Sequence, residues 1–388
     1  MNNTWKIYML ALVSFLVGTT QFCIVGMLDK IAASTDVSVS TAGQLITVFA
    51  LGNAIGTPIV MIATAKMNQR KQLLMALMII LLGIALTLSL PGFALLMASR
   101  VVLGLGTGIF VVTAYSLASK LASPGRQGSA MSNVAMGFSS SLVFGVPIGR
   151  IIAATYDWKT IFWGIGLLCL VATFLVVKYI PAMEGDAAVP LSRRLSFLKQ
   201  PRIAFTLSVT FFVFVGFSVV DTYITPFLAA VMPTMESRMS VILLTLGIGS
   251  LMGSRLGGFL ADRIGVIRTI FCSMVVQALA LMLQSSISGW VIWTIMFLML
   301  WEIAVWTFGP TQNFNLVSLA PEASSIVLSL NSSFVQLGFA AGAGIGGIAI
   351  GSFSILAIPW ISATSVVIAA VIAVLSLGRG PSFVRSRG

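Results

Sequence analysis

The sequence predicts an all-α membrane protein of twelve transmembrane helices, divided into two bundles of six. The first observation is composition: 58% of the 388 residues are hydrophobic and only 8% are charged, whereas about 25% of the residues in a soluble domain are charged. The second is that apolar runs of about 20 residues, enough to cross a hydrocarbon core of about 30 Å, recur along the chain. The third is one long polar segment, residues 181–202, which separates six such runs from six.

Each apolar run between polar breaks is expected to form one helix. Helices are favoured over barrel strands because the runs are long and uniformly apolar, and because a helix satisfies its own backbone hydrogen bonds in lipid. The first run lacks the cleavage site of a signal peptide, so we expect it to be retained. The expected helices are 6–33, 41–64, 72–91, 94–118, 128–153 and 159–180 in an N-terminal bundle (1–180), then, after a cytoplasmic linker (181–202), 203–230, 237–261, 266–288, 290–313, 325–351 and 356–378 in a C-terminal bundle (203–388).

The positive charges predict the orientation, because Lys and Arg collect on the cytoplasmic side of membrane proteins. A cytoplasmic N-terminus places most of the 22 Lys and Arg residues on that side. The net charge of +12 is therefore interpreted as a topology signal with some affinity for anionic lipid, and not as a sign of nucleic-acid binding. We expect a multi-pass protein of the inner or plasma membrane with both termini in the cytoplasm. Only Lys30, Arg150, Lys159 and Arg238 fall on the outer side, and Arg100 lies within a helix.

The two halves also resemble each other in sequence, because four pairs of residues share one offset. Parallel six-helix repeats with a binding site between them at mid-membrane are one plan of secondary transporters. Glycine is common in membrane helices, so chance supplies part of this agreement. The pairs are Gly18 with Gly216, Arg70 with Arg268, Asn133 with Asn331 and Gly149 with Gly347.

Three motifs resemble those of the major facilitator superfamily of transporters, and the resemblance extends over essentially the whole chain. GGFLADRIGVIRTI (257–270) resembles the loop signature between the second and third helices of a half. LMASRVVLGLGTG (96–108) resembles a fourth-helix motif around an intramembrane arginine, and GFSSSLVFGVPIG (137–149) resembles a fifth-helix motif associated with antiporters. The resemblance implies the major facilitator fold and assigns conformational roles, although packing alone explains any single glycine. The residues concerned are Gly145, Pro147, Gly149, Gly258, Asp262, Arg263, Gly265 and Arg268.

The physical roles expected for these motifs are close packing and latching. Asp262, Arg263 and Arg268 stand at a cytoplasmic helix end, where ion pairs and helix-dipole contacts can join neighbouring helices. The small residues of the fifth helix allow close approach to another helix, and Pro147 can bend it.

Within the superfamily, TTQFCIVGML, STAGQLITVFALG and GVPIG resemble the bacterial twelve-helix drug/proton antiporter branch. These motif sequences are similar to those of purine-base and nucleoside efflux proteins, and also to those of sugar-efflux and chloramphenicol-resistance members. Related efflux proteins carry TTEF where this chain has TTQF, so the amide of Gln21 stands where the resemblance implies a proton-coupling carboxylate. An amide has the shape and hydrogen-bonding capacity of a protonated glutamate but never ionises.

Several explanations of Gln21 stay open at this point. The first explanation is that Asp221 or Glu302 carries the proton instead. The second is that the protein is an uncoupled facilitator, and the third is that the amide is an engineered mimic of the protonated state. Alternatively, Gln21 simply binds substrate or a neighbouring helix.

Three acidic residues are predicted to lie at membrane depth, where an ionisable group costs at least about 2.5–3.5 kcal/mol and normally faces a cavity or a partner. Asp221 in the seventh helix and Glu302 in the tenth are the candidate proton carriers. The alternative for Asp221 is a structural hydrogen bond to Thr222, Tyr223 or a facing helix. Glu302 is flanked by tryptophans, which favours contact with an aromatic substrate. Asp29, in the first helix, either shares in proton coupling, pairs with Lys30 or reaches the outer interface.

Arg100 is assigned to the same proton-coupling group of residues. It either joins the first and fourth helices or responds to protonation of a nearby carboxyl group, and the structural alternative is an arginine satisfied by helix carbonyl groups. Other polar and aromatic residues of helices one, four, seven, ten and eleven are expected to line a pocket suited to a heteroaromatic solute. Gly309-Pro310 is expected to break the tenth helix near this pocket. The candidate substrate-binding residues are Gln21, Tyr115, Tyr223, Trp306, Gln312, Asn313, Asn331 and Gln336.

No enzymatic constellation stands out in the sequence. Histidine is absent, so the commonest neutral-pH base and metal ligand is missing. The sequence also contains no Walker motif, and the glycine-rich stretch GLGTG (104–108) lies within a predicted membrane helix and is not a nucleotide-binding loop. The sequence therefore predicts a secondary transporter without cofactor or metal, driven by the proton gradient, that exports a small organic compound such as a purine base, nucleoside, drug or sugar. One chain suffices for this function. An importer or an uncoupled facilitator of the same solutes is the alternative, and a membrane-embedded enzyme is a more distant one.

Overall fold

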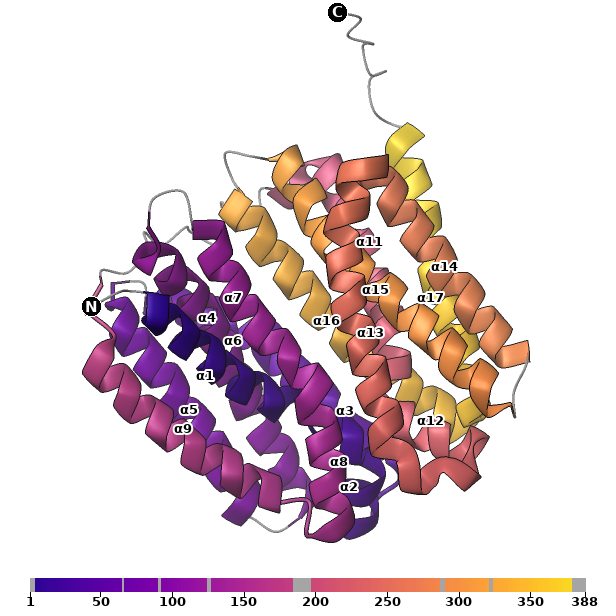
Figure 1. Ribbon diagram of the computed structural model, residues 1–388, viewed down its shortest axis with the longest axis horizontal. Coiled ribbons are helices and arrows are strands. Elements are labelled where there is room, and N and C mark those ends of the chain that lie inside the picture. Colours follow the sequence, from indigo (N-terminus) through magenta and orange to yellow (C-terminus); the bar gives the residue numbers. More distant parts are fainter. Residues whose placement is uncertain are drawn as a thin grey trace, which may run out of the picture.

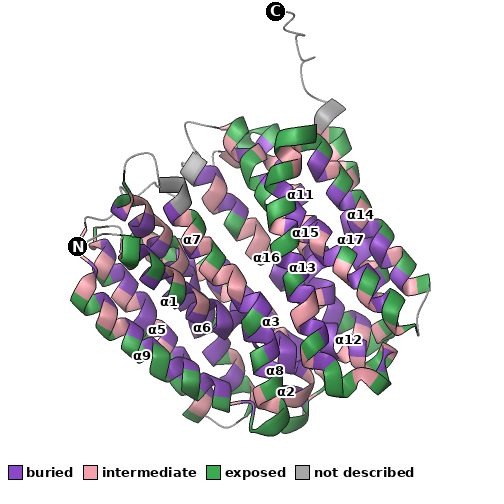
Figure 2. Ribbon diagram, in the orientation of Figure 1, coloured by how far each residue is buried: buried purple, intermediate pink, exposed green. Residues whose placement is uncertain are grey.

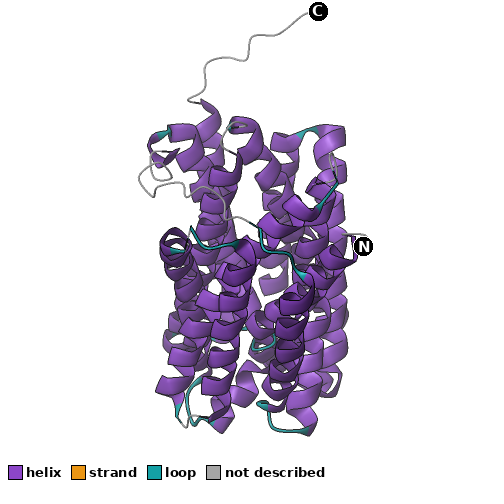
Figure 3. Ribbon diagram, turned by 90° about the vertical axis from the view of Figure 1, so that its left-hand side faces the viewer, coloured by secondary structure: helices purple, strands orange, loops and turns teal. Residues whose placement is uncertain are grey.

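The computed structural model describes residues 4–64, 66–89, 92–123, 127–183, 197–286, 290–320 and 324–378. These residues contain eleven helices long and apolar enough to cross a membrane, and a bent pair of helices at the N-terminus makes a twelfth span. The helices run side by side with their loops at two opposite ends (Figure 3). The prediction of an all-α membrane protein with twelve spans is therefore confirmed.

Each half of the chain forms one bundle of helices, and the two bundles lie next to each other (Figure 1). The first bundle contains α1 (Thr4–Phe22), α2 (Leu28–Ser34), α3 (Val39–Leu51), α4 (Thr57–Ala63), α5 (Gln69–Ser89), α6 (Phe93–Leu121), α7 (Gln127–Ser140), α8 (Val146–Thr155) and α9 (Thr160–Tyr179). The second contains α11 (Pro201–Thr222), α12 (Ile224–Val231), α13 (Met239–Ile264), α14 (Val266–Ser286), α15 (Val291–Leu319), α16 (Ser324–Ser352) and α17 (Ile358–Gly378).

The first and seventh spans are interrupted, although the sequence predicts continuous helices at 6–33 and 203–230. The first span bends by 41° between α1 and α2, where Gly26 lies against the backbone of Val146. The seventh span is interrupted at Tyr223, between α11 and α12. Pro226 explains this second interruption, because proline has no N–H to donate to the carbonyl group one turn earlier.

Proline has different effects in three other spans. Pro58 and Pro147 each follow a π-helical turn, at Gly52–Gly56 and Ser141–Gly145, which accommodates the missing donor. Pro310, in contrast, lies inside the continuous helix α15, so the expectation that it breaks the tenth helix is wrong. Membrane helices tolerate proline where neighbouring helices and hydroxyl side chains supply compensating contacts.

Apolar side chains cover the surface as well as the core. Among the large exposed ones, Ile292 is 79% exposed and Trp163 is 69% exposed, and exposed positions follow the outward faces of the bundles (Figure 2). A soluble protein rarely carries so much contiguous apolar surface. Lipid tails are as apolar as these side chains, so this surface is the one expected of a membrane-embedded bundle.

The two bundles meet at one end and separate toward the other (Figure 1). At the end where α2, α8 and α12 lie, the Ser40 hydroxyl donates a hydrogen bond to the Gly347 carbonyl group. The Thr225 hydroxyl donates in the opposite sense, to the carbonyl group of Val25. We call this region, defined by these four residues, the closed end.

Candidate functional site

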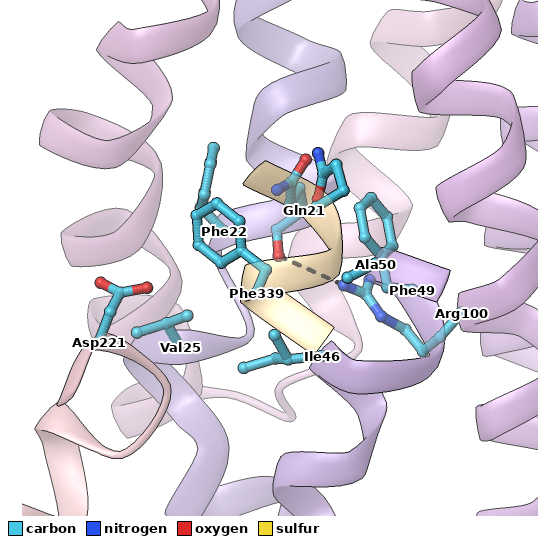
Figure 4. A pocket seen from close by; sticks show the side chains of 10 residues that line it. Gln21, Phe22, Val25, Ile46, Phe49, Ala50, Arg100, Asp221 and Phe339 are labelled. Carbon is cyan, nitrogen blue, oxygen red and sulfur yellow. Dashed lines mark hydrogen bonds between the residues drawn. The ribbon is translucent and has the colours of Figure 1, made fainter. Parts of the chain in front are cut away.

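A pocket lies between the two bundles, at the level where the first span is interrupted (Figure 4). Its free volume is about 10 Å³, room for about one water molecule. Four of the predicted site residues line it together, although they come from four different helices: Gln21, Arg100, Asp221 and Gln336. The rest of the lining is apolar and consists of Phe22, Val25, Ile46, Phe49, Ala50 and Phe339.

Arg100 joins α6 to the end of α1. The side chain is 0% exposed; its two terminal nitrogens donate to the backbone carbonyl groups of Thr20 at 2.8 Å and of Gln21 at 3.3 Å. The last carbonyl groups of a helix have no intrahelical donor, so the interruption of the first span supplies these acceptors. The guanidinium also lies 4.6 Å from the ring centre of Phe49. Both expected roles, a link between the first and fourth spans and satisfaction by carbonyl groups, match this geometry.

The charge of Arg100 has no carboxylate partner among the described residues, and its Nε is buried without a hydrogen bond. Gln21 is 8% exposed, and its Oε1 is likewise buried without a partner. The first bundle therefore presents a positive charge and an unpaired amide oxygen to the pocket.

Asp221 lies on the other side of the pocket, on α11 (Figure 4). It forms no hydrogen bond with a described residue, and its sequence neighbours have other partners. Thr222 pairs with Ser218 at 3.2 Å, and the Tyr223 hydroxyl donates to the carbonyl group of Ala343 at 2.8 Å. The structural partners considered for Asp221 on its own helix are therefore occupied elsewhere.

Glu302, on α15, is close enough to Asp221 for the two carboxyl groups to interact electrostatically. It is 7% exposed, and its Oε1 accepts a hydrogen bond from the Trp306 indole at 2.8 Å. The predicted substrate-binding residue Trp306 thus orients the predicted proton carrier Glu302. We call Asp221 and Glu302 the acidic site, because two carboxylates that interact electrostatically repel each other when both are ionised.

Aromatic rings surround this acidic site. Phe217 stacks on Trp301 with ring centres 5.6 Å apart and planes inclined by 20°. Its ring also meets Trp306 and Phe339 edge-on, with centres 6.2 and 5.5 Å away. We name Phe217, Trp301, Trp306 and Phe339 the aromatic cluster. Since Phe339 also lines the pocket, the cluster connects the pocket to Glu302.

Three other predicted binding residues link helices of the second bundle instead of lining this pocket. Gln312 donates to the carbonyl group of Thr206 at 2.8 Å and to the Thr210 hydroxyl at 3.0 Å. Asn331 donates to Asn313 at 2.8 Å and accepts from Thr210 at 2.8 Å. These bonds tie α11, α15 and α16 together.

The remaining two predicted binding residues also lie outside the pocket. Tyr223 is fully buried, and the space it occupies depends on glycines, because an added Cβ at Gly43 or Gly346 would overlap its ring. Tyr115 is partly buried and packs against the hydrophobic core.

Asp29 has a partner that the sequence did not indicate. Arg150, at 5% side-chain exposure, lies 2.6 Å from Asp29, which is 25% exposed. The same guanidinium lies 3.8 Å from Glu236 in the second bundle. Lys30 is therefore not the partner, and the ion pair lies in the closed end and not in the central pocket. The sequence could not reveal this pair, because Asp29 and Arg150 are 121 residues apart and meet only in the folded protein.

Breaking this ion pair is expected to destabilise the protein. Arg150→Met and Asp29→Asn should each cost about 1–3 kcal/mol, and the double variant should cost clearly less than the sum, because one interaction is lost only once. Thermal unfolding of the purified protein measures this cycle, and Lys30→Met is the control. Additive losses would show that Asp29 and Arg150 do not stabilise each other.

The motif residues of the fifth span pack against the first span. An added Cβ at Gly145 would lie 2.9 Å from the Thr19 hydroxyl, and one at Gly149 would lie 3.2 Å from Cys23. Pro147 is buried between them. The close approach expected of this motif is therefore present.

The loop motif of the second bundle is exposed. Gly265 has a φ of +91°, which favours glycine, and it ends α13. Asp262 and Arg268 form no ion pair with a described residue, and Arg263 lies 5.3 Å over the ring of Phe259. Nothing lies within 4 Å of an added Cβ at Gly258. The latching contacts expected here are not formed among the described residues.

A bundle pair of this kind, with a pocket that contains charged and amide side chains between its halves at the level of interrupted helices, is the architecture of a secondary transporter. The chain belongs to the Major Facilitator Superfamily, whose family model matches residues 10–326. Proteins of this family are transporters and not enzymes; they bind small molecules, need no cofactor and typically act as monomers in the membrane.

The chain is also similar to individual proteins along almost its full length. The uncharacterized MFS-type transporter YbcL of Bacillus subtilis (strain 168) is 42% identical over 381 residues, 98% of each chain. A bacterial homologue of the human lysosomal transporter Spinster, in an inward-facing and occupied conformation, is 16% identical; it has a TM-score of 0.75 and coverage of 98% of this chain and 97% of that one. The nucleoside transporter NupG is 11% identical with a TM-score of 0.76, over 97% of this chain and 100% of that one. At these identities the two structures support the fold alone.

Proposed function

We propose that the protein is a proton-coupled exporter of a small organic compound. The observation that carries this proposal is the position of Asp221: it lines the pocket between the bundles, has no hydrogen-bond partner among the described residues, and interacts with the buried carboxyl group of Glu302. Carboxyl groups at membrane depth are costly and mark ion or proton pathways. Repulsion between the two carboxylates favours uptake of one proton by the pair.

Coupling follows from competition for this acidic site. A bound proton removes one of the two negative charges of the carboxyl pair, and a solute group that needs that carboxylate binds only after the proton leaves. Each ligand thus weakens the binding of the other, and this reciprocal coupling is what proton-for-solute exchange requires. Glu302 keeps its orientation through the Trp306 hydrogen bond, so the site is prepared before either ligand arrives.

Alternating access is supported by the arrangement of the bundles. They are joined at the closed end by the Ser40 and Thr225 hydrogen bonds and separate toward the opposite end (Figure 1). If both termini are cytoplasmic, as the Lys and Arg distribution predicts, this state faces the cytoplasm. The pocket holds about one water molecule, so solute binding requires the bundles to move relative to each other.

The aromatic cluster supports a solute with an aromatic or apolar body, a class that includes purine bases, nucleosides and many drugs. We place the protein in the bacterial plasma membrane on the strength of its similarity to the Bacillus relative. An uncoupled facilitator of the same solutes is the second candidate, and the observation in its favour is the non-ionising Gln21 beside Arg100.

The experiment is solute transport into proteoliposomes with an imposed pH gradient, using radiolabelled adenine, inosine, lactose and chloramphenicol. Gradient-driven accumulation is expected to fall about 5- to 150-fold in Asp221→Asn and Glu302→Gln, the range of a coupling free energy of about 1–3 kcal/mol. Solute exchange without a gradient should persist in Glu302→Gln, which keeps the Asp221 carboxylate for the solute. Asp36→Asn, which alters an exposed loop carboxylate, is the matched control. Full gradient-driven accumulation in both pocket variants would exclude these residues as carriers.

A further inference from the structure

The central pocket has a positive end and a negative end. Arg100 and Asp221 lie on opposite sides of it, with Val25, Ile46 and Phe339 between them (Figure 4). The two charged groups form no ion pair with each other among the interactions of the structure. An apolar gap therefore separates two charges of opposite sign.

The positive end is incomplete in this state. Arg100 is fully buried and its Nε has no partner, although its two terminal nitrogens each donate one bond to a carbonyl group. The pocket lining beside Arg100 includes the aromatic ring of Phe49 and the amide of Gln21, and no carboxylate pairs with the guanidinium among the described residues. Burying an uncompensated guanidinium is unfavourable. An anionic group of a ligand would complete this end, since a guanidinium binds a carboxylate through parallel N–H bonds.

The negative end is incomplete in the complementary sense. Asp221 is only partly buried and has no hydrogen-bond donor among the described residues, whereas the nearby Glu302 already accepts from Trp306. Phe339 brings the aromatic cluster to the pocket wall beside it. Carboxylates next to aromatic faces are favourable surroundings for an organic cation.

We propose that the pocket binds a zwitterionic solute with an apolar or aromatic body, with its anionic group at Arg100 and its cationic group at Asp221. The inference rests on the proposed exporter function and names its substrate class. The cationic group competes with the proton for the acidic site, so the same contact that binds the solute couples it to the proton. The anionic group selects among cations, because a solute without it leaves Arg100 unpaired.

The closing experiment compares solutes that differ only in their charged groups. Binding of phenylalanine, phenethylamine and 3-phenylpropionate to the purified full-length protein is measured by quenching of tryptophan fluorescence and by calorimetry, together with leucine, isoamylamine and 4-methylpentanoate as an aliphatic series. In at least one series the zwitterion is expected to bind about 10- to 100-fold more tightly than either singly charged analogue, the range of a hydrogen bond to a charged group. Amines that bind as tightly as their zwitterions in both series, or failure of both zwitterions to bind, would overturn the proposal.

Variants assign the two ends. Arg100→Gln should abolish the tighter binding of the zwitterion relative to the amine. Asp221→Asn should abolish its tighter binding relative to the carboxylate. Arg238→Gln, at an exposed arginine outside the pocket, should change neither difference in affinity. Monodispersity and thermal unfolding check that each variant folds, and the comparison of solutes on the unaltered protein stands without any variant. If amines without an anionic group exchange for protons, the zwitterion proposal is wrong and the proposed exporter function is retained. If the zwitterion binds but proton coupling is unchanged in Asp221→Asn, the proposed coupling role of Asp221 is wrong and the substrate class is retained.

Discussion

Replacing Gln21 with glutamate is expected to make solute binding strongly dependent on pH. At alkaline pH the new carboxylate lies beside Arg100, neutralises it and competes with an anionic group of the solute. At acid pH the protonated side chain again resembles the amide, so binding returns to the level of the unaltered protein. The expected difference between the two pH limits is about 5- to 150-fold, the range of a site–site coupling of about 1–3 kcal/mol.

The measurement is a binding isotherm at several pH values, for the Gln21→Glu variant and the unaltered protein side by side. A substitution of the same chemistry outside the pocket, Gln200→Glu, controls for the added charge. Equal pH profiles for variant and parent would mean that residue 21 does not act on Arg100 through charge. If the variant accumulates solute to a higher concentration ratio than the unaltered protein under the same pH gradient, residue 21 is a coupling site. That result would also support the second candidate function, an uncoupled facilitator.

Replacing Gly104 with valine is expected to prevent stable packing of the first bundle. An added Cβ at this position would overlap the backbone carbonyl group of Phe49, and a backbone atom cannot move aside as a flexible side chain can. Overpacking of this kind costs about 1–3 kcal/mol or more. Since α6 carries Arg100 and α3 carries Phe49, the same change also displaces the guanidinium from the ring beneath it.

Thermal unfolding and the yield of monodisperse protein measure this effect. Gly164→Val, on α9, is the matched control, because nothing lies within 4 Å of an added Cβ there. The two substitutions have the same helix propensity cost, so the difference between them isolates the contact with Phe49. Equal stability of the two variants would contradict the close approach of α3 and α6.

Hydropathy is sufficient to predict the spans, because lipid requires long apolar helices with internally satisfied backbones. The interruptions of the helices are harder to predict. Pro226 interrupts the seventh span while Pro310 leaves α15 continuous, and the difference depends on neighbours. Around Pro310, the hydroxyls of Thr307 and Thr311 donate to carbonyl groups of α13 at 3.1 and 3.2 Å, contacts that a single sequence does not reveal.

The candidate site was predictable to a similar extent. The cost of burying a charge or an amide in lipid singles out Arg100, Asp221, Glu302 and Gln21 from sequence alone. Which polar residues face the pocket and which tie helices together was not predictable, since Gln312 occurs on a span predicted to line the pocket but bonds to Thr206. Helix rotation and long-range partners decide this, and both are properties of the folded bundle.

Among the contacts that hold the two bundles together at the closed end are two hydrogen bonds from neutral hydroxyl groups. Ser40 and Thr225 each donate to a backbone carbonyl group across the interface, and a neutral hydrogen bond of this kind contributes about 0.5–1.5 kcal/mol. The reciprocal pair therefore corresponds to a population ratio on the order of ten to a hundred. Because each acceptor is a main-chain oxygen, only the two hydroxyl residues can be deleted by mutation. Ser40→Ala and Thr225→Val thus offer a graded adjustment of the resting equilibrium that leaves every charge of the transporter in place.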